Sequence, residues 1–183
     1  MPSLLLIAQI TQALTIFGAF LMLLWIIQLA MPGLFNSAPF VGSVPERQRK
    51  MLALLDLQPG ETVIDLGSGD GRLLIAAAER GCRVVGYEVN LFLVWYSRLW
   101  LWRRGFGGRA TVHWTSFWRA DLTAADAVML YGFPPLMARF EAKFAAELKP
   151  GARVTTARFP LPTQKPVKAD GDVFLYEKVS DTI

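Results

Sequence analysis

Three glycines follow a short apolar run in the stretch VIDLGSGDGR, and two aspartates flank them. Gly67, Gly69 and Gly71 occupy the place between a candidate strand and a candidate helix, where glycines allow a tight turn and a close approach of the backbone to a ligand. A dinucleotide site is typified by the spacing G-x-G-x-x-G, with pyrophosphate at the helix N-terminus. The spacing here is G-x-G-x-G, and Asp65 and Asp70 make the loop acidic. Such a loop disfavours pyrophosphate and favours a cationic ligand.

A third carboxylate, Glu88, ends the next apolar run. It follows the glycines by about twenty residues, the interval at which an acidic residue accepts hydrogen bonds from ribose hydroxyls. This holds for nicotinamide dinucleotides and for S-adenosylmethionine alike, so Glu88 indicates a nucleoside and leaves its identity open. S-adenosylmethionine carries an ammonium and a sulfonium and no phosphate, so the acidic loop favours it over a dinucleotide.

The elements around these residues alternate between strand-like and helix-like patterns. Strands are predicted at residues 62–66, 83–89, 110–114, within 124–133, at 152–159 and at 172–179. Helices are predicted at residues 46–57, 71–80, within 87–104 and at 135–149. Short apolar strands that alternate with helices predict an α/β fold with a doubly wound, Rossmann-like, mostly parallel sheet.

The N-terminal arm carries no charged side chain before Glu46. Its mostly apolar run, residues 4–30, exceeds the roughly 20 residues that cross a bilayer as a helix. A secretory signal would be shorter and would begin with basic residues. We therefore expect a retained transmembrane helix at residues 1–33, a linker at 34–45 and the main domain at 46–183. A cleaved signal peptide and a docked hydrophobic helix are the alternatives.

The distribution of charge gives an expected location. Lysine and arginine occur only after the arm, which places the main domain in the cytoplasm by the positive-inside rule. The arm lacks the arginines of a mitochondrial transit peptide, which favours a bacterial inner membrane.

Composition limits the partners. The chain is 53% hydrophobic and 19% charged, with a net charge of +4. A basic balance suits nucleic acid or anionic lipid. No basic cluster accompanies a nucleic-acid motif, so we expect a bilayer as partner and no nucleic acid. The single cysteine, Cys82, excludes an intramolecular disulfide and a cysteine-rich metal site, and we expect no metal.

The stretch YEVNLFLVWYSRLWLWRR, residues 87–104, is unusually aromatic, with Trp95, Trp100 and Trp102 in one predicted helix. Asn90 is placed to cap that helix. The helix is apolar on nearly every face, which excludes a simple amphipathic surface helix. Packing on the sheet uses one face only. The rest either completes a core or meets lipid headgroups, where tryptophan and arginine are stable.

Several motifs together carry a family resemblance. They are PFV at 39–41, DLGSGDGR at 65–72, GYEVN at 86–90, LVWYSR at 93–98, YGFPPLM at 131–137 and RFPLP at 158–162. With them the chain resembles the class I, seven-β-strand S-adenosylmethionine-dependent methyltransferases. More narrowly, it resembles the membrane-anchored lysine N-methyltransferases of the ATP synthase c-subunit and the adenine nucleotide translocase, and their prokaryotic relatives.

The resemblance implies that S-adenosylmethionine binds at the glycine loop, with its ribose on Glu88. Ser116 stands where the family usually has an acidic residue that accepts a hydrogen bond from the adenine amino group. A serine hydroxyl accepts such a bond more weakly than a carboxylate. The cofactor-binding candidates are Asp65, Gly67, Ser68, Gly69, Glu88 and Ser116.

The resemblance also implies that the target nitrogen arrives at the end of the fourth strand. The substrate-pocket candidates there are Tyr131, Gly132, Phe133, Pro134 and Pro135. An aromatic pocket of Tyr131, Phe133 and Trp118 would lower the pKa of a target lysine by desolvation and hold methylated ammonium by cation–π contact. Simple packing at the strand end is the alternative. No catalytic base is identifiable, and we interpret His113, the only histidine, as structural.

These observations favour a membrane-anchored S-adenosylmethionine-dependent methyltransferase that acts on a lysine of a membrane protein. A methyltransferase for a lipid or a hydrophobic small molecule is the first alternative, because the hydrophobic arm and the aromatic helix suit it equally. A non-catalytic, membrane-tethered nucleoside-binding module is the second.

Overall fold

A computed structural model describes residues 2–30 and 45–179 of the chain, which forms two compact units, residues 1–39 and 40–183. The described residues of the first unit, 2–30, form the helix α1 (Pro2–Ala30). Within it Leu4–Leu23 is long and apolar enough, by length and composition alone, to cross a membrane. The motif PFV and the predicted linker, apart from Pro45, lie outside the described residues.

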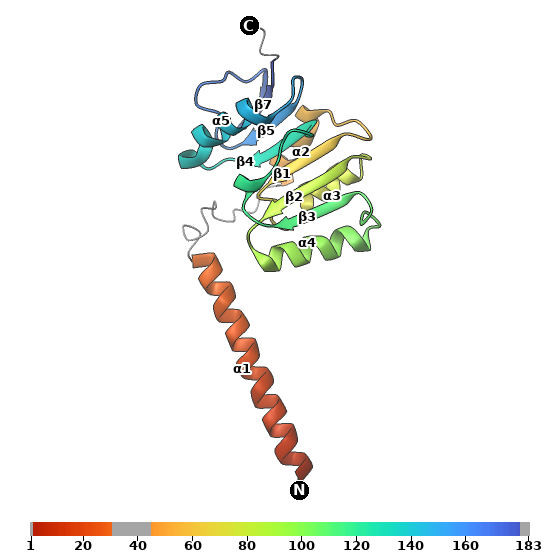
Figure 1. Ribbon diagram of the computed structural model, residues 1–183, viewed down its shortest axis with the longest axis vertical. Helices are drawn as coiled ribbons and strands as arrows, with labels where there is room; N and C mark the ends of the chain where they lie inside the picture. The colour runs from red at the N-terminus through yellow and green to blue at the C-terminus, as the bar shows by residue number, and fades with distance from the viewer. Residues whose placement is uncertain (1, 31–44, 180–183) are drawn as a thin grey trace. The chain divides into compact units, whose positions relative to one another are not determined.

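The second unit is built on a seven-stranded sheet with the order β3-β2-β1-β4-β5-β7-β6 (Figure 1). Neighbouring strands from β3 to β5 are parallel, whereas β7 is antiparallel to both β5 and β6. The strands are β1 (Thr62–Leu66), β2 (Arg83–Glu88), β3 (Ala110–Trp114), β4 (Ala127–Tyr131), β5 (Arg153–Ala157), β6 (Lys168–Asp170) and β7 (Val173–Glu177). The predicted α/β fold with a mostly parallel sheet is confirmed.

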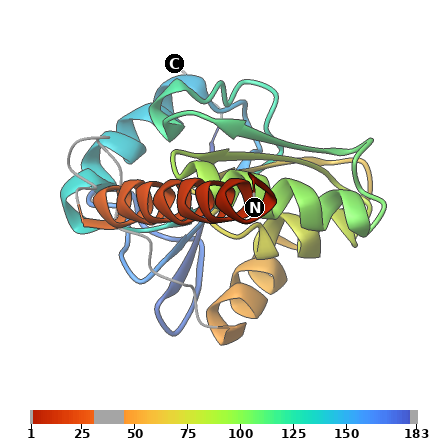
Figure 2. The ribbon, with the colours of Figure 1, turned by 90° about the horizontal axis from the view of Figure 1, so that it is seen from below.

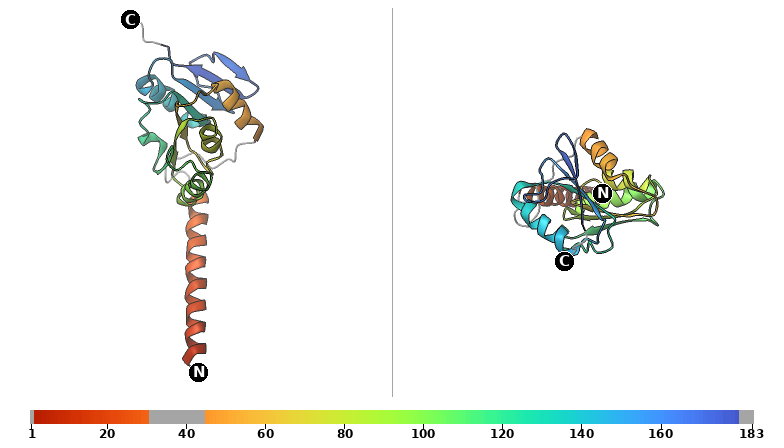
Figure 3. Two further views of the ribbon diagram at one scale, coloured as in Figure 1. Left: turned by 90° about the vertical axis from the view of Figure 1, so that its right-hand side faces the viewer. Right: turned by 90° about the horizontal axis from the view of Figure 1, so that it is seen from above.

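Helices cover both faces of this sheet. They are α2 (Pro45–Leu55), α3 (Arg72–Ala78), α4 (Leu91–Arg103) and α5 (Met137–Glu147), with short 3-10 turns η2 (Phe117–Arg119) and η3 (Pro134–Leu136). Figures 2 and 3 show α2, α3 and α4 on one side of the sheet and α5 on the other. Side chains of a strand alternate between the faces, so Val63 packs in the cluster with α2 and α3, whereas Ile64 and Leu66 pack in the cluster with α5.

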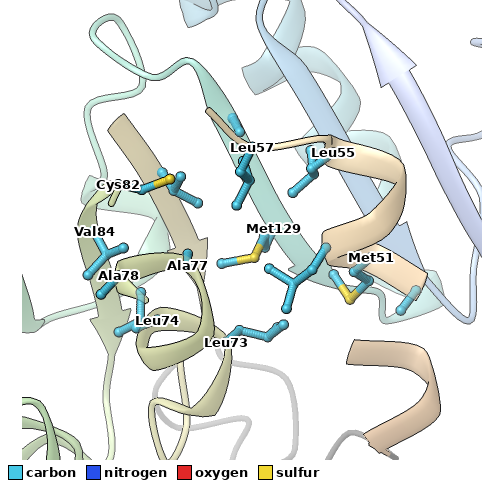
Figure 4. Close-up of a cluster of buried hydrophobic side chains, with 14 of the residues drawn as sticks. Met51, Leu55, Leu57, Leu73, Leu74, Ala77, Ala78, Cys82, Val84 and Met129 are labelled. Atoms are coloured by element: carbon cyan, nitrogen blue, oxygen red, sulfur yellow. The ribbon is translucent and has the colours of Figure 1, made fainter. Parts of the chain in front are cut away.

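The core under α2 and α3 holds the glycine loop in place. Leu55 of α2, Leu74 of α3 and Met129 of β4 are all fully buried there (Figure 4). Cys82 is buried in the same cluster just before β2. Because β1 and α3 are both fixed by this core, the loop that joins them has little freedom.

Helix α4 has one packed side and one exposed side. The side chain of Asn90 caps its first turn by accepting from the backbone N–H groups of Phe92 and Leu93, at 3.0 and 3.3 Å, as predicted. Val94, Ser97 and Leu101 face inward and are buried. Ser97 lies against Gly71 at the start of α3, where a Cβ on the glycine would come within 2.7 Å of the serine Cβ. The small size of both residues therefore allows α3 and α4 to lie close together.

Candidate active site

The parallel strands bring the predicted site residues to one edge of the sheet. Leu66 lies opposite both Tyr87 and Leu130, and Glu88 lies opposite Trp114. The segments that follow β1, β2, β3 and β4 therefore leave the sheet together at its carboxyl edge. In open α/β sheets this edge is where ligands bind.

Backbone hydrogen bonds join the glycine loop to β2. Gly67 and Ser68 both donate their N–H groups to the carbonyl oxygen of Tyr87, at 2.9 and 3.1 Å. Gly69 donates to Glu88 Oε2 at 2.9 Å, and Asn90 donates to Glu88 Oε1 at 2.8 Å. One carboxylate thus fixes both the glycine loop and the beginning of α4. Each carboxylate oxygen keeps further lone pairs that can accept from a ligand.

The two buried carboxylates make the loop strongly favourable for a cation. Asp65 lies near the carboxyl end of β1 and its exposed fraction is 3%. The exposed fraction of Glu88 is 9%. Burial, together with the nearby charges of Glu88 and Asp70, raises the pKa of Asp65 to about 8. Burial also raises the pKa of Glu88, against the opposing effect of the N–H groups of Asn90 and Gly69. A positive ligand group would relieve this repulsion.

The loop also has space and an unused hydroxyl. Gly67 has a φ of 90°, and no heavy atom lies within 4 Å of the position that a Cβ would take there. Ser68 Oγ is buried and has no hydrogen-bond partner within the described part of the chain. A buried polar group without a partner is costly unless something supplies one. The residues therefore fit a ligand that lies over the glycines and carries both positive charge and hydrogen-bonding groups.

Ser116 follows β3 by two residues, on the far side of β2 from the glycine loop. It is half-buried and caps η2, since its Oγ accepts from the N–H of Trp118 at 3.4 Å. The preceding residue, Thr115, donates its N–H to the carbonyl oxygen of Glu88 at 3.0 Å. Ser116 is therefore beside the ribose candidate, as an adenine contact would require.

The five predicted substrate-pocket residues divide by burial. Tyr131 and Phe133 are half-buried, whereas Pro134 and Pro135 are exposed. Gly132 is buried and its N–H donates to the carbonyl oxygen of Ala157 at 2.9 Å. A Cβ at Gly132 would lie 3.1 Å from that oxygen. The structure thus gives Gly132 a packing role, and the other four side chains are accessible at the end of β4.

The predicted three-aromatic pocket does not form as one cluster. Tyr131 packs against the core under α2 and α3, whereas Trp118 packs against the core under α5. Trp118 stacks on Phe140 at 4.6 Å between ring centroids, and the guanidinium of Arg139 lies 3.8 Å from the Trp118 ring. Trp118 lies in the turn η2 and not in a strand, so the alternation of strand side chains could not predict which core it joins.

Sequence reasoning missed the side chains that hold Tyr131. Arg47 of α2 donates to the Tyr131 hydroxyl at 3.3 Å and pairs with Asp172 at 2.7 Å. Arg47 and Asp172 lie far apart in the chain, so no local pattern could reveal their contact. His113, interpreted as structural, stacks on Tyr87 with 5.2 Å between ring centroids.

Comparison with known proteins decides the family. The family model described as the ANTKMT methyltransferase domain matches residues 65–168, which include the glycine loop, Glu88 and the Tyr131 segment. The chain belongs to this family. The predicted resemblance to seven-stranded methyltransferases is thereby confirmed.

Two relatives and one solved structure illustrate the family. The ATP synthase c-subunit lysine N-methyltransferase of Rattus norvegicus is 39% identical over 134 residues, 73% of this chain and 62% of the relative. The adenine nucleotide translocase lysine N-methyltransferase of Mus musculus is 40% identical over 135 residues, 73% of this chain and 58% of the relative. An RNA methyltransferase of Salinibacter ruber, solved with S-adenosyl-L-homocysteine, is 27% identical with a TM-score of 0.73, covering 77% of this chain and 95% of that one.

The match to the curated relatives is partial. This chain spans 62%, 57% and 54% of the lengths of the rat, human and mouse enzymes named for the ATP synthase c-subunit.

Proposed function

We propose that this protein is an S-adenosylmethionine-dependent protein-lysine N-methyltransferase, held at a membrane by α1, whose substrate is a membrane protein. The observation that carries the proposal is the pair of buried carboxylates, Asp65 and Glu88, around an open glycine turn at the carboxyl edge of the sheet. The relatives named as lysine N-methyltransferases supply the expected substrate class.

The residues of the loop have distinct roles toward the cofactor. Asp65 faces its cationic methionine end, and Ser68 Oγ offers that end a hydrogen bond. Glu88 accepts from the ribose, while its bonds to Gly69 and Asn90 keep the loop in shape. Ser116 accepts from the adenine. The bound cofactor supplies an electrophilic methyl group attached to a sulfonium.

The protein's contribution to the reaction is alignment and desolvation. A lysine must be neutral to attack, and an apolar environment lowers its pKa. The half-buried rings of Tyr131 and Phe133 at the end of β4 provide such an environment. Arg47 fixes the hydroxyl of Tyr131 and thus the orientation of its ring. Holding the two reactants in line can supply several kcal/mol of the barrier reduction, roughly 7–11 kcal/mol in the best-oriented cases.

The attachment to a membrane is supported by α1. From Leu4 to Leu23 its side chains are apolar, apart from Gln9, Gln12 and two threonines, and all but the half-buried Leu21 are exposed. Two threonines satisfy their hydroxyls on the helix itself, since Thr11 donates to the carbonyl oxygen of Ile7 and Thr15 to that of Thr11, at 2.9 and 2.8 Å. A helix with such an exposed apolar surface is stable in lipid. The substrates named for the relatives, a component of ATP synthase and a translocase, suit an enzyme placed there.

Transfer of labelled methyl groups tests the proposal. Full-length protein is incubated with S-adenosylmethionine carrying a labelled methyl group and with native membranes from the source cells. We expect label in a small hydrophobic protein, released as methyl-lysine on hydrolysis. Label confined to the lipid extract would favour a lipid substrate instead, and label in RNA would favour the activity named for the Salinibacter relative. Cofactor binding without label in any fraction would favour the non-catalytic module.

The raised pKa of Asp65 predicts that cofactor binding releases a proton. A cationic ligand stabilises the ionised carboxylate, so the pKa of Asp65 falls on binding from about 8. Affinity should then rise with pH below 8, by up to about tenfold per pH unit, and level off above it. Titration calorimetry at pH 7 in two buffers of different ionisation enthalpy measures the proton. Asp65→Asn should abolish the release, and a release unchanged in that variant would assign the proton to another group.

A further inference from the structure

Helix α4 carries an exposed face that is almost wholly aromatic and aliphatic. Its members are Phe92, Trp95, Tyr96, Leu99, Trp102 and Arg103, which we call the α4 outer face. Trp95 and Trp102 are each 69% exposed, and Tyr96 is 50% exposed. A water-facing helix side normally bears charged and polar residues. Large exposed apolar patches mark surfaces that bind a protein or a membrane.

Helix geometry makes this face continuous. Phe92, Trp95, Leu99 and Trp102 recur at intervals of three and four residues, the spacing of one helix side. The buried residues Val94, Ser97 and Leu101 follow the same spacing on the opposite side. The α4 outer face therefore runs the length of the helix, and the sheet contacts only its reverse.

The face extends to the carboxyl edge of the sheet. Trp114, at the end of β3, is 59% exposed, and its indole N–H donates to the carbonyl oxygen of Val89 at 2.9 Å. Val89 directly precedes the helix cap Asn90. Trp114 therefore continues the exposed aromatic surface from α4 to the end of β3. Glu88 lies opposite Trp114 on the neighbouring strand β2.

The charges of α4 favour an anionic partner. The helix and its C-cap contain Arg98, Arg103 and Arg104 and no acidic residue. Arg98 donates to the carbonyl oxygen of Val112 at 3.0 and 2.5 Å, and Arg104 pairs with Glu79 at 2.7 Å. Arg103 is exposed beside Leu99 and Trp102 on the outer face. Exposed tryptophan and tyrosine with arginine is the composition of the membrane–water interface, where anionic headgroups attract arginine.

We propose that the α4 outer face and Trp114 lie in the headgroup layer of the same bilayer that α1 enters. This inference rests on the proposed membrane attachment of α1, to which α2 is joined by only fourteen residues, 31–44. That covalent link keeps the domain close to the membrane, so the lipid surface is present at a high effective concentration. Because Trp114 continues the face to the carboxyl edge, the docked domain presents its active site to residues of membrane proteins near the lipid surface.

Fluorescence quenching by lipid tests this docking in the full chain. Protein with Trp25→Phe, which removes the tryptophan of α1, is reconstituted into phosphatidylcholine–phosphatidylglycerol vesicles with brominated acyl chains. Flotation with the vesicles reports attachment through α1. We expect strong quenching of the remaining tryptophans, reduced by roughly half or more when Trp95→Phe and Trp102→Phe are added, since these are the most exposed rings of the face. Trp118→Phe is the control, because Trp118 packs on Phe140, and should leave the quenched signal unchanged.

The outcomes separate the inference from the proposed function. Flotation with quenching that does not depend on Trp95 and Trp102 would overturn the docking of α4 while leaving the attachment through α1 intact. Flotation without quenching, together with cross-linking of α4 to a second copy or to another protein, would make the face a protein interface. Failure of the full chain to float would overturn both the attachment and the docking.

Discussion

Replacing Glu88 with alanine is expected to lower the affinity for S-adenosylmethionine at least about a hundredfold, since each lost hydrogen bond to a charged group is worth about 1.5–3 kcal/mol. The substitution removes the acceptor for the ribose. It also frees the N–H groups of Gly69 and Asn90, which the two carboxylate oxygens now hold at 2.9 and 2.8 Å. Titration calorimetry with the cofactor or with S-adenosylhomocysteine measures the change directly.

Two further variants make this result interpretable. Glu79→Ala removes a carboxylate that is exposed and pairs with Arg104 on the surface, so it should leave affinity unchanged. Glu88→Gln keeps one oxygen acceptor and loses the charge, and should fall between the wild type and Glu88→Ala. An affinity for Glu88→Ala within threefold of the wild-type value would mean that the cofactor does not bind at this carboxylate.

The second large effect is expected on stability, from Gly71→Ala. Gly71 has a φ of 81°, and an added Cβ would lie 2.7 Å from the Cβ of Ser97 on α4. The left-handed conformation costs a side chain about 1–2 kcal/mol, and overpacking a core adds about 1–3 kcal/mol. The free energy of unfolding should therefore fall by about 3 kcal/mol, measured as a shift of the urea midpoint of the full chain in detergent.

Gly105→Ala provides a matched control for the backbone cost. Gly105 has a φ of 78°, but no heavy atom lies within 4 Å of a Cβ placed there. Gly105→Ala should lower the free energy of unfolding only by the cost of the left-handed conformation, about 1–2 kcal/mol. Adding Ser97→Gly to Gly71→Ala removes the clashing atom and should restore part of the stability. Equal losses at both glycines would show that α3 and α4 do not pack as closely as described.

The cofactor loop was predictable because its signals are local. Asp65, the glycines and Glu88 lie within two strand–turn units, and each follows an apolar run that ends at the same edge of the sheet. The parallel register then brings them together without help from the rest of the chain. Cap residues such as Asn90 are predictable for the same reason, because an N-cap is defined by the residues that immediately follow it.

Long-range pairs were not predictable in this way. Strand β6 contains only Lys168, Ala169 and Asp170, all exposed, and exists because it pairs with β7. Arg47 reaches Tyr131 and Asp172 across the fold, and Lys50 of α2 pairs with Asp170 at 3.1 Å. These contacts depend on the position of the β6–β7 hairpin beside β5, which a periodic sequence pattern does not predict.

Helix α4 shows the limit of composition. Its apolar residues predicted either a core or a lipid contact. In the structure only Val94, Ser97 and Leu101 of α4 are buried. Ser97 is polar, but its small side chain fits against Gly71, at which an added Cβ would clash with it. The aromatic residues that dominate the sequence are those left exposed, because burial depends on which side of the helix meets the sheet.

The proposed function is tested most directly by the masses of membrane proteins in cells that contain or lack this chain. Intact-mass measurement followed by fragmentation should find a small membrane protein that is heavier by whole methyl groups on a lysine, only when the wild-type chain is present. Cells with Glu88→Ala in its place should show the unmodified mass. The proposed function would be contradicted if the membrane proteins had the same masses in all three kinds of cell. It would also be contradicted if only lipid or RNA gained methyl groups when the chain is present.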